Sequence, residues 1–103
     1  MIKIIDGKRY NTETATMICD TSNGLNRGDF GHESSALYAT KKGSYFIAGN
    51  GGPSSRFATH NGNESTDGSD LIPLDREDAM VECERHGTAA DIEELFADMI
   101  EDA

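Results

Sequence analysis

The sequence has no tryptophan and only two prolines, and its aromatic residues are limited to three tyrosines and four phenylalanines. A chain of 103 residues with so few large apolar side chains can bury one modest core, which excludes a second independent one. We therefore expect a single domain over residues 1–103, of marginal stability. The chain nevertheless contains groups of adjacent apolar residues, such as residues 45–47, that a disordered acidic chain would lack.

Long apolar runs are also absent. No stretch approaches the roughly 18 apolar residues of a membrane span. The opening segment, MIKIIDGKRY, contains no apolar run long enough for a signal peptide. We therefore expect a soluble, unexported protein that works in the cytoplasm.

Cysteine is scarce, with only Cys19 and Cys83 and no CxxC spacing. In a reducing cytosol these are expected to be free thiols, with a disulfide between them as the alternative. Cys83 and His86 are three positions apart and could face one metal ion, but two ligands are half of a closed zinc site. We predict no metal site and no cofactor.

Motifs that carry a catalytic mechanism are missing as well. The sequence contains no GxSxG, HExxH or P-loop pattern. The run from Gly49 to Arg56 could hold an anion through backbone N–H groups, or its glycines could serve tight turns instead. We predict a protein that is not an enzyme, with a small enzyme or ligand-binding protein using loop 49–69 as one alternative.

Basic residues are nearly absent from the second half. Residues 1–60 contain seven Lys or Arg and five acids, whereas residues 61–103 contain fourteen acids and only Arg76 and Arg85. The chain therefore divides into a basic half and an acidic half, with a net charge of −10. An acidic surface repels nucleic-acid phosphates and attracts basic protein surfaces.

The first half predicts two β-hairpins. Residues 2–5 are rich in β-branched side chains and precede Asp6-Gly7, a dipeptide typical of a type I′ turn, so the chain should return through Tyr10. Residues 35–40 and 44–48 should pair around a turn at residues 41–43. Residues 13–19 fit a short helix, with a strand as the competing interpretation, and residues 21–32 and 49–69 are expected to be loops.

The second half predicts a short edge strand and two helices. Pro73 places residues 70–74 at a sheet edge, because proline cannot donate to a ladder. Asp75 can cap a helix that ends at Gly87, and Thr88 with Asp91 can cap the next one. An apolar stripe on the last helix comprises Ile92, Leu95, Phe96, Met99 and Ile100. The expected fold is α+β: a small antiparallel sheet of three to five strands, built from hairpins, with two or three helices packed on one face.

The acidic helices are the candidate partner surface. Residues 91–102 contain no base, and like charges four residues apart, such as Glu94 and Asp98, cost a few tenths of a kcal/mol each. This surface is either a solvated face or a partner site. The candidate partner-binding acids are Asp75, Glu77, Asp78, Glu82, Asp91, Glu93, Glu94, Asp98, Glu101 and Asp102.

Three stretches of the chain resemble small proteins encoded on phages and other bacterial mobile elements. They are IIDGKRYNTETAT at 4–16, ALYATKKGSYFIAGNGGPSSRFA at 36–58 and LIPLDREDAMVE at 71–82, roughly half the chain. Several small acidic proteins of that genomic setting are anti-CRISPR inhibitors, some of which mimic DNA in charge and block a Cas protein. The resemblance implies a bacterial host cell and carries over no catalytic residue, and the final helix lies outside it.

Together, charge and resemblance predict a non-enzymatic, anti-CRISPR-like inhibitor that binds a basic nucleic-acid-handling surface of a Cas protein or complex. Its contact would be protein–protein, without direct nucleic-acid binding. The second alternative is a mobile-element regulatory or accessory protein that contacts DNA or a host regulator. That protein would use bases of the first half, which are Lys3, Lys8, Arg9, Lys41 and Lys42.

Overall fold

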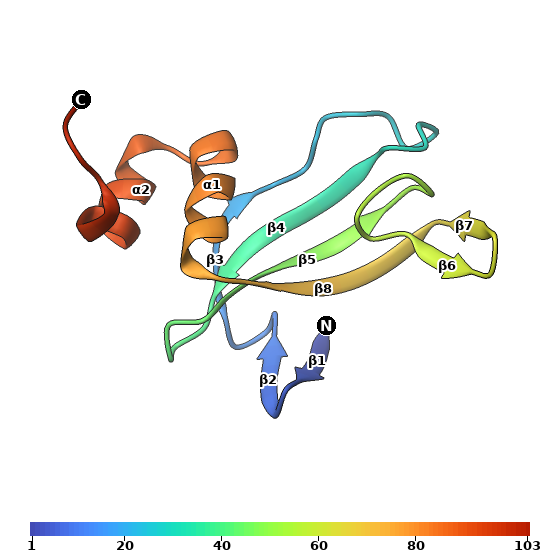
Figure 1. Cartoon of the computed structure of the whole chain (residues 1–103), viewed down its shortest axis with the longest axis horizontal. Helices are drawn as coiled ribbons and strands as arrows, with labels where there is room; N and C mark the ends of the chain where they lie inside the picture. The colour runs from blue at the N-terminus through green and yellow to red at the C-terminus, as the bar shows by residue number, and fades with distance from the viewer.

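A four-stranded antiparallel sheet forms the centre of the computed structural model, which describes residues 1–103. Its strand order is β3-β4-β5-β8, with β3 at Thr16–Asp20, β4 at Glu33–Ala39, β5 at Tyr45–Gly51 and β8 at Gly68–Leu74. The molecule measures 45 × 33 × 22 Å. The helices lie at one end of its long axis, and a small hairpin of residues 59–66 lies at the other (Figure 1). The predicted α+β class is confirmed, and so is the edge position of the strand that contains Pro73.

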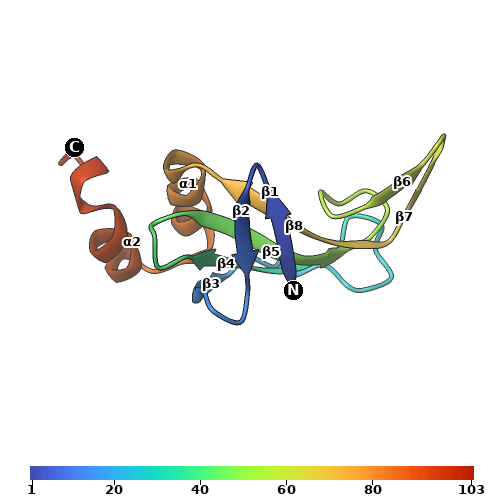
Figure 2. The same ribbon diagram turned by 90° about the horizontal axis from the view of Figure 1, so that it is seen from below.

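The N-terminal hairpin comprises β1 (Ile2–Ile5) and β2 (Lys8–Asn11). Ile5 pairs with Lys8, and the two residues between them, Asp6 and Gly7, have φ values of 51° and 77°, as the predicted type I′ turn requires. The hairpin does not extend the main sheet. It lies across the face opposite helix α1 (Figure 2), so the sheet is covered on both sides.

Within residues 13–19, for which a helix and a strand were the two interpretations, residues 13–15 are a turn and β3 begins at Thr16. β3 pairs with β4, and the register shifts between Met17 and Cys19. Its threonine and isoleucine favour a pleated surface over a helix. A helix here would also leave the outer edge of β4 without a partner, so tertiary pairing decides the outcome.

Residues 49–69, expected to be one irregular loop, are largely ordered strand and turn. β5 continues to Gly51, β8 begins at Gly68, and between them a second hairpin forms from β6 (Thr59–Asn61) and β7 (Glu64–Thr66). Gly62 supplies the left-handed backbone of its turn, with φ of 60°. The sequence did not reveal these strands because all their residues are exposed and polar.

The core has two layers, one on each face of the main sheet. Along β5, Tyr45 and Ile47 pack with Phe96 and the helix side, whereas Phe46 and Ala48 pack with Tyr10 of the hairpin. Successive side chains of a strand point to opposite faces, which explains the alternation. Because both faces are covered, residues 45–48 of β5 are all buried.

The C-terminal helices begin where their caps predict. Helix α1 spans Arg76–His86 with Asp75 as its N-cap, and helix α2 spans Ala89–Phe96 behind a Thr88–Asp91 capping box. The second helix is shorter than predicted: a 3-10 turn, η1 (Ala97–Met99), follows it, and Ile100, which is 40% exposed, lies beyond both. Neither helix is both long enough and apolar enough to cross a bilayer.

Candidate functional site

The ten candidate acids fall into two groups, those with partners inside the chain and those without. Asp75 accepts a hydrogen bond from the Asp78 backbone N–H at 2.7 Å, and Asp91 closes the capping box. Asp98 pairs with Arg76, and Glu82 is buried against Arg56. These four acids stabilise the fold. No hydrogen bond or ion pair occupies the carboxylates of the other six, which are Glu77, Asp78, Glu93, Glu94, Glu101 and Asp102.

Glu82 is not part of an exposed acidic face, as the sequence had suggested. It is only 7% exposed, and its Oε1 accepts a hydrogen bond from Arg56 Nη1 at 2.5 Å. Arg56 also binds Glu33, which accepts from the guanidinium Nε and from the backbone N–H at 3.0 Å each. Arg56 therefore bridges two carboxylates and is not free to hold an anion in the glycine-rich segment.

The two carboxylates favour the charged form of the Arg56 guanidinium. Burial alone would lower the pKa of the Arg56 guanidinium, but hydrogen bonds and attraction from Glu82 and Glu33 outweigh it, so the pKa lies above its usual value. The second oxygen of Glu82 has no hydrogen-bond partner, and His86 Nε2 lies 3.9 Å away. A buried carboxylate with one free oxygen depends strongly on its single cation.

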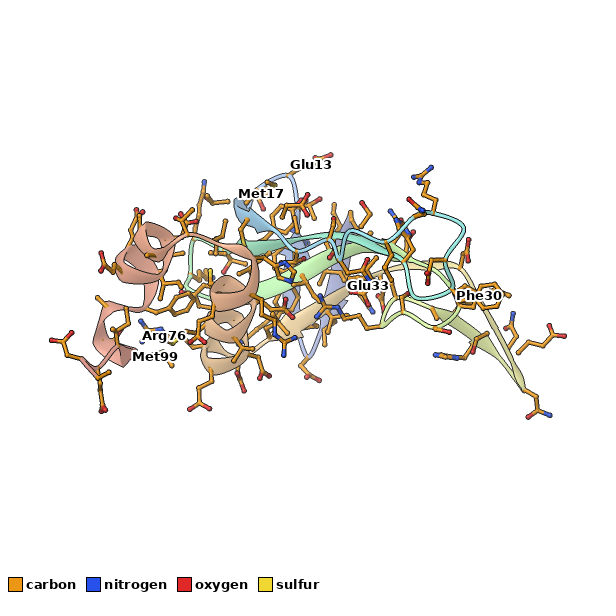
Figure 3. All side chains as sticks on the ribbon, turned by 90° about the horizontal axis from the view of Figure 1, so that it is seen from above. Glu13, Met17, Phe30, Glu33, Arg76 and Met99 are labelled. Atoms are coloured by element: carbon orange, nitrogen blue, oxygen red, sulfur yellow. The ribbon has the colours of Figure 1, made fainter.

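Arg76 supplies the base that residues 91–102 lack. Its guanidinium reaches from α1 to the carboxylate of Asp98 and donates to the Leu95 carbonyl at 3.0 Å. These hydrogen bonds hold the pKa of Asp98 below its usual range. In Figure 3, Arg76 lies beside the segment that carries Met99. The repulsion expected along this helix is therefore offset at Asp98.

Two of the six unpaired acids, Glu93 and Glu101, line an apolar groove between α1 and the C-terminal segment. The groove has a volume of about 370 Å³. Three of its eight lining residues are carboxylates, and the other five are apolar. We call it the acidic groove: its floor is Met80, Ala89, Ile92, Met99 and Ile100, and its rim is Glu84, Glu93 and Glu101.

Glu84 is the rim residue that the sequence analysis missed. It lies four positions after Met80, so both side chains share one face of α1. That spacing was the available signal. Met80 is partly buried against the main core cluster and also lines the groove.

A second groove, of about 490 Å³, lies between the N-terminal hairpin and the β4–β5 turn. Four of the five bases that the DNA-contact alternative nominated meet there, and no carboxylate lines it. The fifth, Lys3, pairs with Asp70 at 2.6 Å instead. We call it the basic groove; its lining bases are Lys8, Arg9, Lys41 and Lys42.

A third, wholly polar hollow of about 350 Å³ lies at the end of the glycine-rich segment, and its lining includes Arg27, His32 and Asp67. No apolar residue lines it. Small-molecule sites are typically apolar with a few polar groups, and this hollow lacks the apolar part.

Nucleophile and base meet once, on the small hairpin. His60 Nδ1 lies 2.9 Å from Ser65 Oγ. All residues of β6 and β7 are exposed, the imidazole donates no hydrogen bond to a carboxylate that would orient it, and neither side chain lines a pocket. The pair thus lacks the oriented base and enclosed site that nucleophilic catalysis requires.

Two thiols are buried where α1 packs against the sheet, one on β3 and one on α1. Cys19 and Cys83 are both free, and they belong to the same core cluster. Burial, followed by the neighbouring Cys83, raises the pKa of the Cys19 thiol to about 12. His86 faces Glu82, and nowhere do three side chains of the metal-ligating types come together.

The raised pKa predicts a loss of stability in alkaline solution. The unfolded thiol ionises near its ordinary value of 9.0 and the folded thiol near 12, so between these values the unfolded state binds fewer protons. The free energy of unfolding should therefore fall as pH rises through this window and be unaffected by this group below it. Urea melts at pH 8 and pH 10.5 should show a smaller fall for Cys19→Ala than for the wild type, whereas equal falls would contradict the assignment.

Comparison with known proteins finds no relative: no family model, curated protein or solved structure matches this chain. The resemblance to phage and mobile-element proteins therefore stays a prediction.

Proposed function

We propose that this protein is a non-enzymatic inhibitor of the anti-CRISPR kind, which docks its acidic groove onto a basic, nucleic-acid-handling surface of a Cas protein or complex. The acidic groove is the observation that carries the proposal, since it combines an apolar floor with a carboxylate rim. The choice of a Cas protein as partner rests on the resemblance of residues 4–16, 36–58 and 71–82.

The chemistry of the groove favours a basic protein over other partners. An apolar floor gains free energy when a partner's apolar side chain or the stem of a lysine or arginine covers it. A rim of carboxylates attracts the charged ends of those side chains and rejects acidic surfaces. A nucleic acid would meet the same carboxylates with its phosphates and be repelled.

Four further free acids lie on the same segments without lining the groove. Glu94 and Asp102 continue the negative charge on the C-terminal segment, and Glu77 and Asp78 continue it on the first turn of α1. All four are exposed. A partner with a broad basic face would therefore meet carboxylates from both helices, and its association should be fast and sensitive to salt.

Charge reversal at the groove tests the proposal. The triple variant Glu84→Lys, Glu93→Lys and Glu101→Lys should abolish protection of a targeted plasmid in a bacterium with an active CRISPR system. It should also weaken binding to the inhibited Cas protein by about 100-fold, which corresponds to about 2.7 kcal/mol. Calorimetry with the purified partner measures the affinity, and a plasmid-survival assay measures the inhibition.

The matched control reverses three exposed acids elsewhere, Glu13, Glu64 and Asp67, whose carboxylates make no hydrogen bond or ion pair. It changes the net charge equally and should leave inhibition intact. Full protection by the groove variant would exclude the acidic groove as the docking surface. Wild-type protein that protects against no CRISPR system would exclude the anti-CRISPR assignment itself.

A further inference from the structure

The basic groove gathers cations in a chain that is otherwise strongly acidic. Two of its four bases come from β2 and two from the β4–β5 turn, and these segments are about thirty residues apart in the sequence. Figure 2 shows the hairpin lying across the main sheet near that turn. The groove therefore exists only because the hairpin packs on the sheet face opposite α1.

These four bases have no partners within the chain. Lys3, Arg56 and Arg76 each pair with a carboxylate, whereas the side chains of the four groove bases make no ion pair and no hydrogen bond within the chain. Four exposed cations around one hollow repel one another, and no carboxylate lines the hollow to offset this. An anionic ligand would relieve the repulsion.

Tight turns hold the bases in place. Gly43 has φ of 87° and donates its N–H to the Thr40 carbonyl at 3.0 Å, while Thr40 Oγ1 accepts from the Ser44 N–H at 3.0 Å. The backbone that carries Lys41 and Lys42 is therefore fixed, and only their side chains must be ordered on binding. A fixed backbone lowers the entropy that a ligand must overcome.

The other lining groups indicate what kind of anion fits. The hydroxyls of Thr14, Thr40 and Ser44 and the amide of Asn11 add polar hydrogen-bonding groups beside the cations. The one aromatic residue of the lining, Tyr10, is only 7% exposed and packs edge-on against Phe46, so it offers no free face for a base to stack on. Recognition is directed at charge and not at aromatic rings.

We propose that the basic groove binds a short chain of phosphate groups, between the N-terminal hairpin and the β4–β5 turn. Phosphate oxygens match lysine, arginine and hydroxyl donors, and a volume of about 490 Å³ suits a ligand of nucleotide size. The net charge of −10 disfavours long polyanions, which would also approach the acidic helices. The phosphates could belong to a free polyphosphate compound or to the end of a nucleic acid strand.

This inference is independent of the proposed function. None of the residues that line the basic groove lines the acidic groove. Loss of phosphate binding would leave docking of a basic protein unaffected, and loss of docking would leave phosphate binding unaffected. A result that contradicts one proposal therefore leaves the other unaffected.

Calorimetry with sodium tripolyphosphate as the probe, in about 50 mM salt, tests the groove. We expect a dissociation constant of roughly 10–100 μM, and at least a tenfold weakening in the double variant Lys41→Gln and Lys42→Gln. The matched control, Arg27→Gln with Arg85→Gln, removes two exposed bases outside the groove and should bind like the wild type. Thermal unfolding of each variant checks that the fold is retained.

Binding measurements with two further probes, a short oligonucleotide and citrate, decide where the phosphates come from and whether phosphate is required. Tighter binding of a short single-stranded oligonucleotide than of tripolyphosphate would assign the phosphates to nucleic acid, and the reverse would assign them to a small compound. Absence of tripolyphosphate binding by the wild type would overturn the proposal. So would equal weakening in the control variant, or equally tight binding of citrate, because either would mark a general attraction of anions.

Discussion

Replacement of Arg56 by methionine is expected to lower the free energy of unfolding by about 3 kcal/mol at pH 7. Both Glu33 and Glu82 would lose the guanidinium, but the methionine keeps the backbone N–H that binds Glu33, so the larger loss falls on Glu82. Glu82 would then keep its buried carboxylate without the guanidinium 2.5 Å away. A buried charge that loses its partner is far more costly than the pair was favourable. Urea denaturation measures the change.

The double variant Arg56→Met with Glu82→Leu provides the control. Removing both charges should restore most of the lost stability, because an apolar pair can replace a buried ion pair at little cost. Glu82 neighbours the core residue Cys83, so a leucine would extend an existing apolar layer. A single Arg56→Met variant as stable as the wild type would show that the bridge does not support the fold.

Replacement of Gly49 by alanine is expected to cost about 3 kcal/mol or more, the second large effect. Gly49 lies in β5 and pairs with Ser35 of β4. An added Cβ would come to 2.2 Å from the Ser34 carbonyl oxygen and 2.6 Å from Ser35 Cα. These are backbone atoms of the adjacent central strand, so neither can swing away and β4 itself must shift. Thermal and urea unfolding both report the loss.

Gly28 is the matched control for this substitution. A Cβ at Gly28 would meet nothing within 4 Å, and its φ is not positive. Gly28→Ala should therefore change stability by no more than about 0.5 kcal/mol. Equal stability of the two variants would contradict the close approach of β4 and β5 at Gly49.

Local signals in the sequence determined much of the fold in advance. A turn dipeptide or a helix cap acts on its own neighbours, so its role can be predicted without knowledge of distant residues. This holds for the turn at Asp6-Gly7 and for the caps Asp75 and Thr88. The exposed hairpin β6–β7 has no apolar face and gave no such signal. The placement of β1–β2 on the far face of the sheet was equally hidden, since it depends on packing of Tyr10 against Phe46.

The candidate site was only partly predictable for the same reason. Charge counts located the acids, but they could not show that Glu82 meets Arg56 from 26 positions away or that Asp98 meets Arg76. Nor could they show that Lys8 and Lys41 line one groove. Contacts between distant segments sort the charged residues into structural pairs and free surfaces, and a composition cannot do this.

Helix α2 has a single fully buried residue, and partly buried side chains together with Arg76 supply its other contacts with the rest of the protein. Phe96 is its one fully buried residue; it packs against Tyr45 at 5.5 Å, with the Arg76 guanidinium 5.8 Å from its ring centre. Because only one residue of α2 is fully buried, we expect the C-terminal segment to open locally at a lower cost than global unfolding. Its amides should exchange with solvent faster than those of β5, and a partner that touches both helices would slow that exchange as it binds.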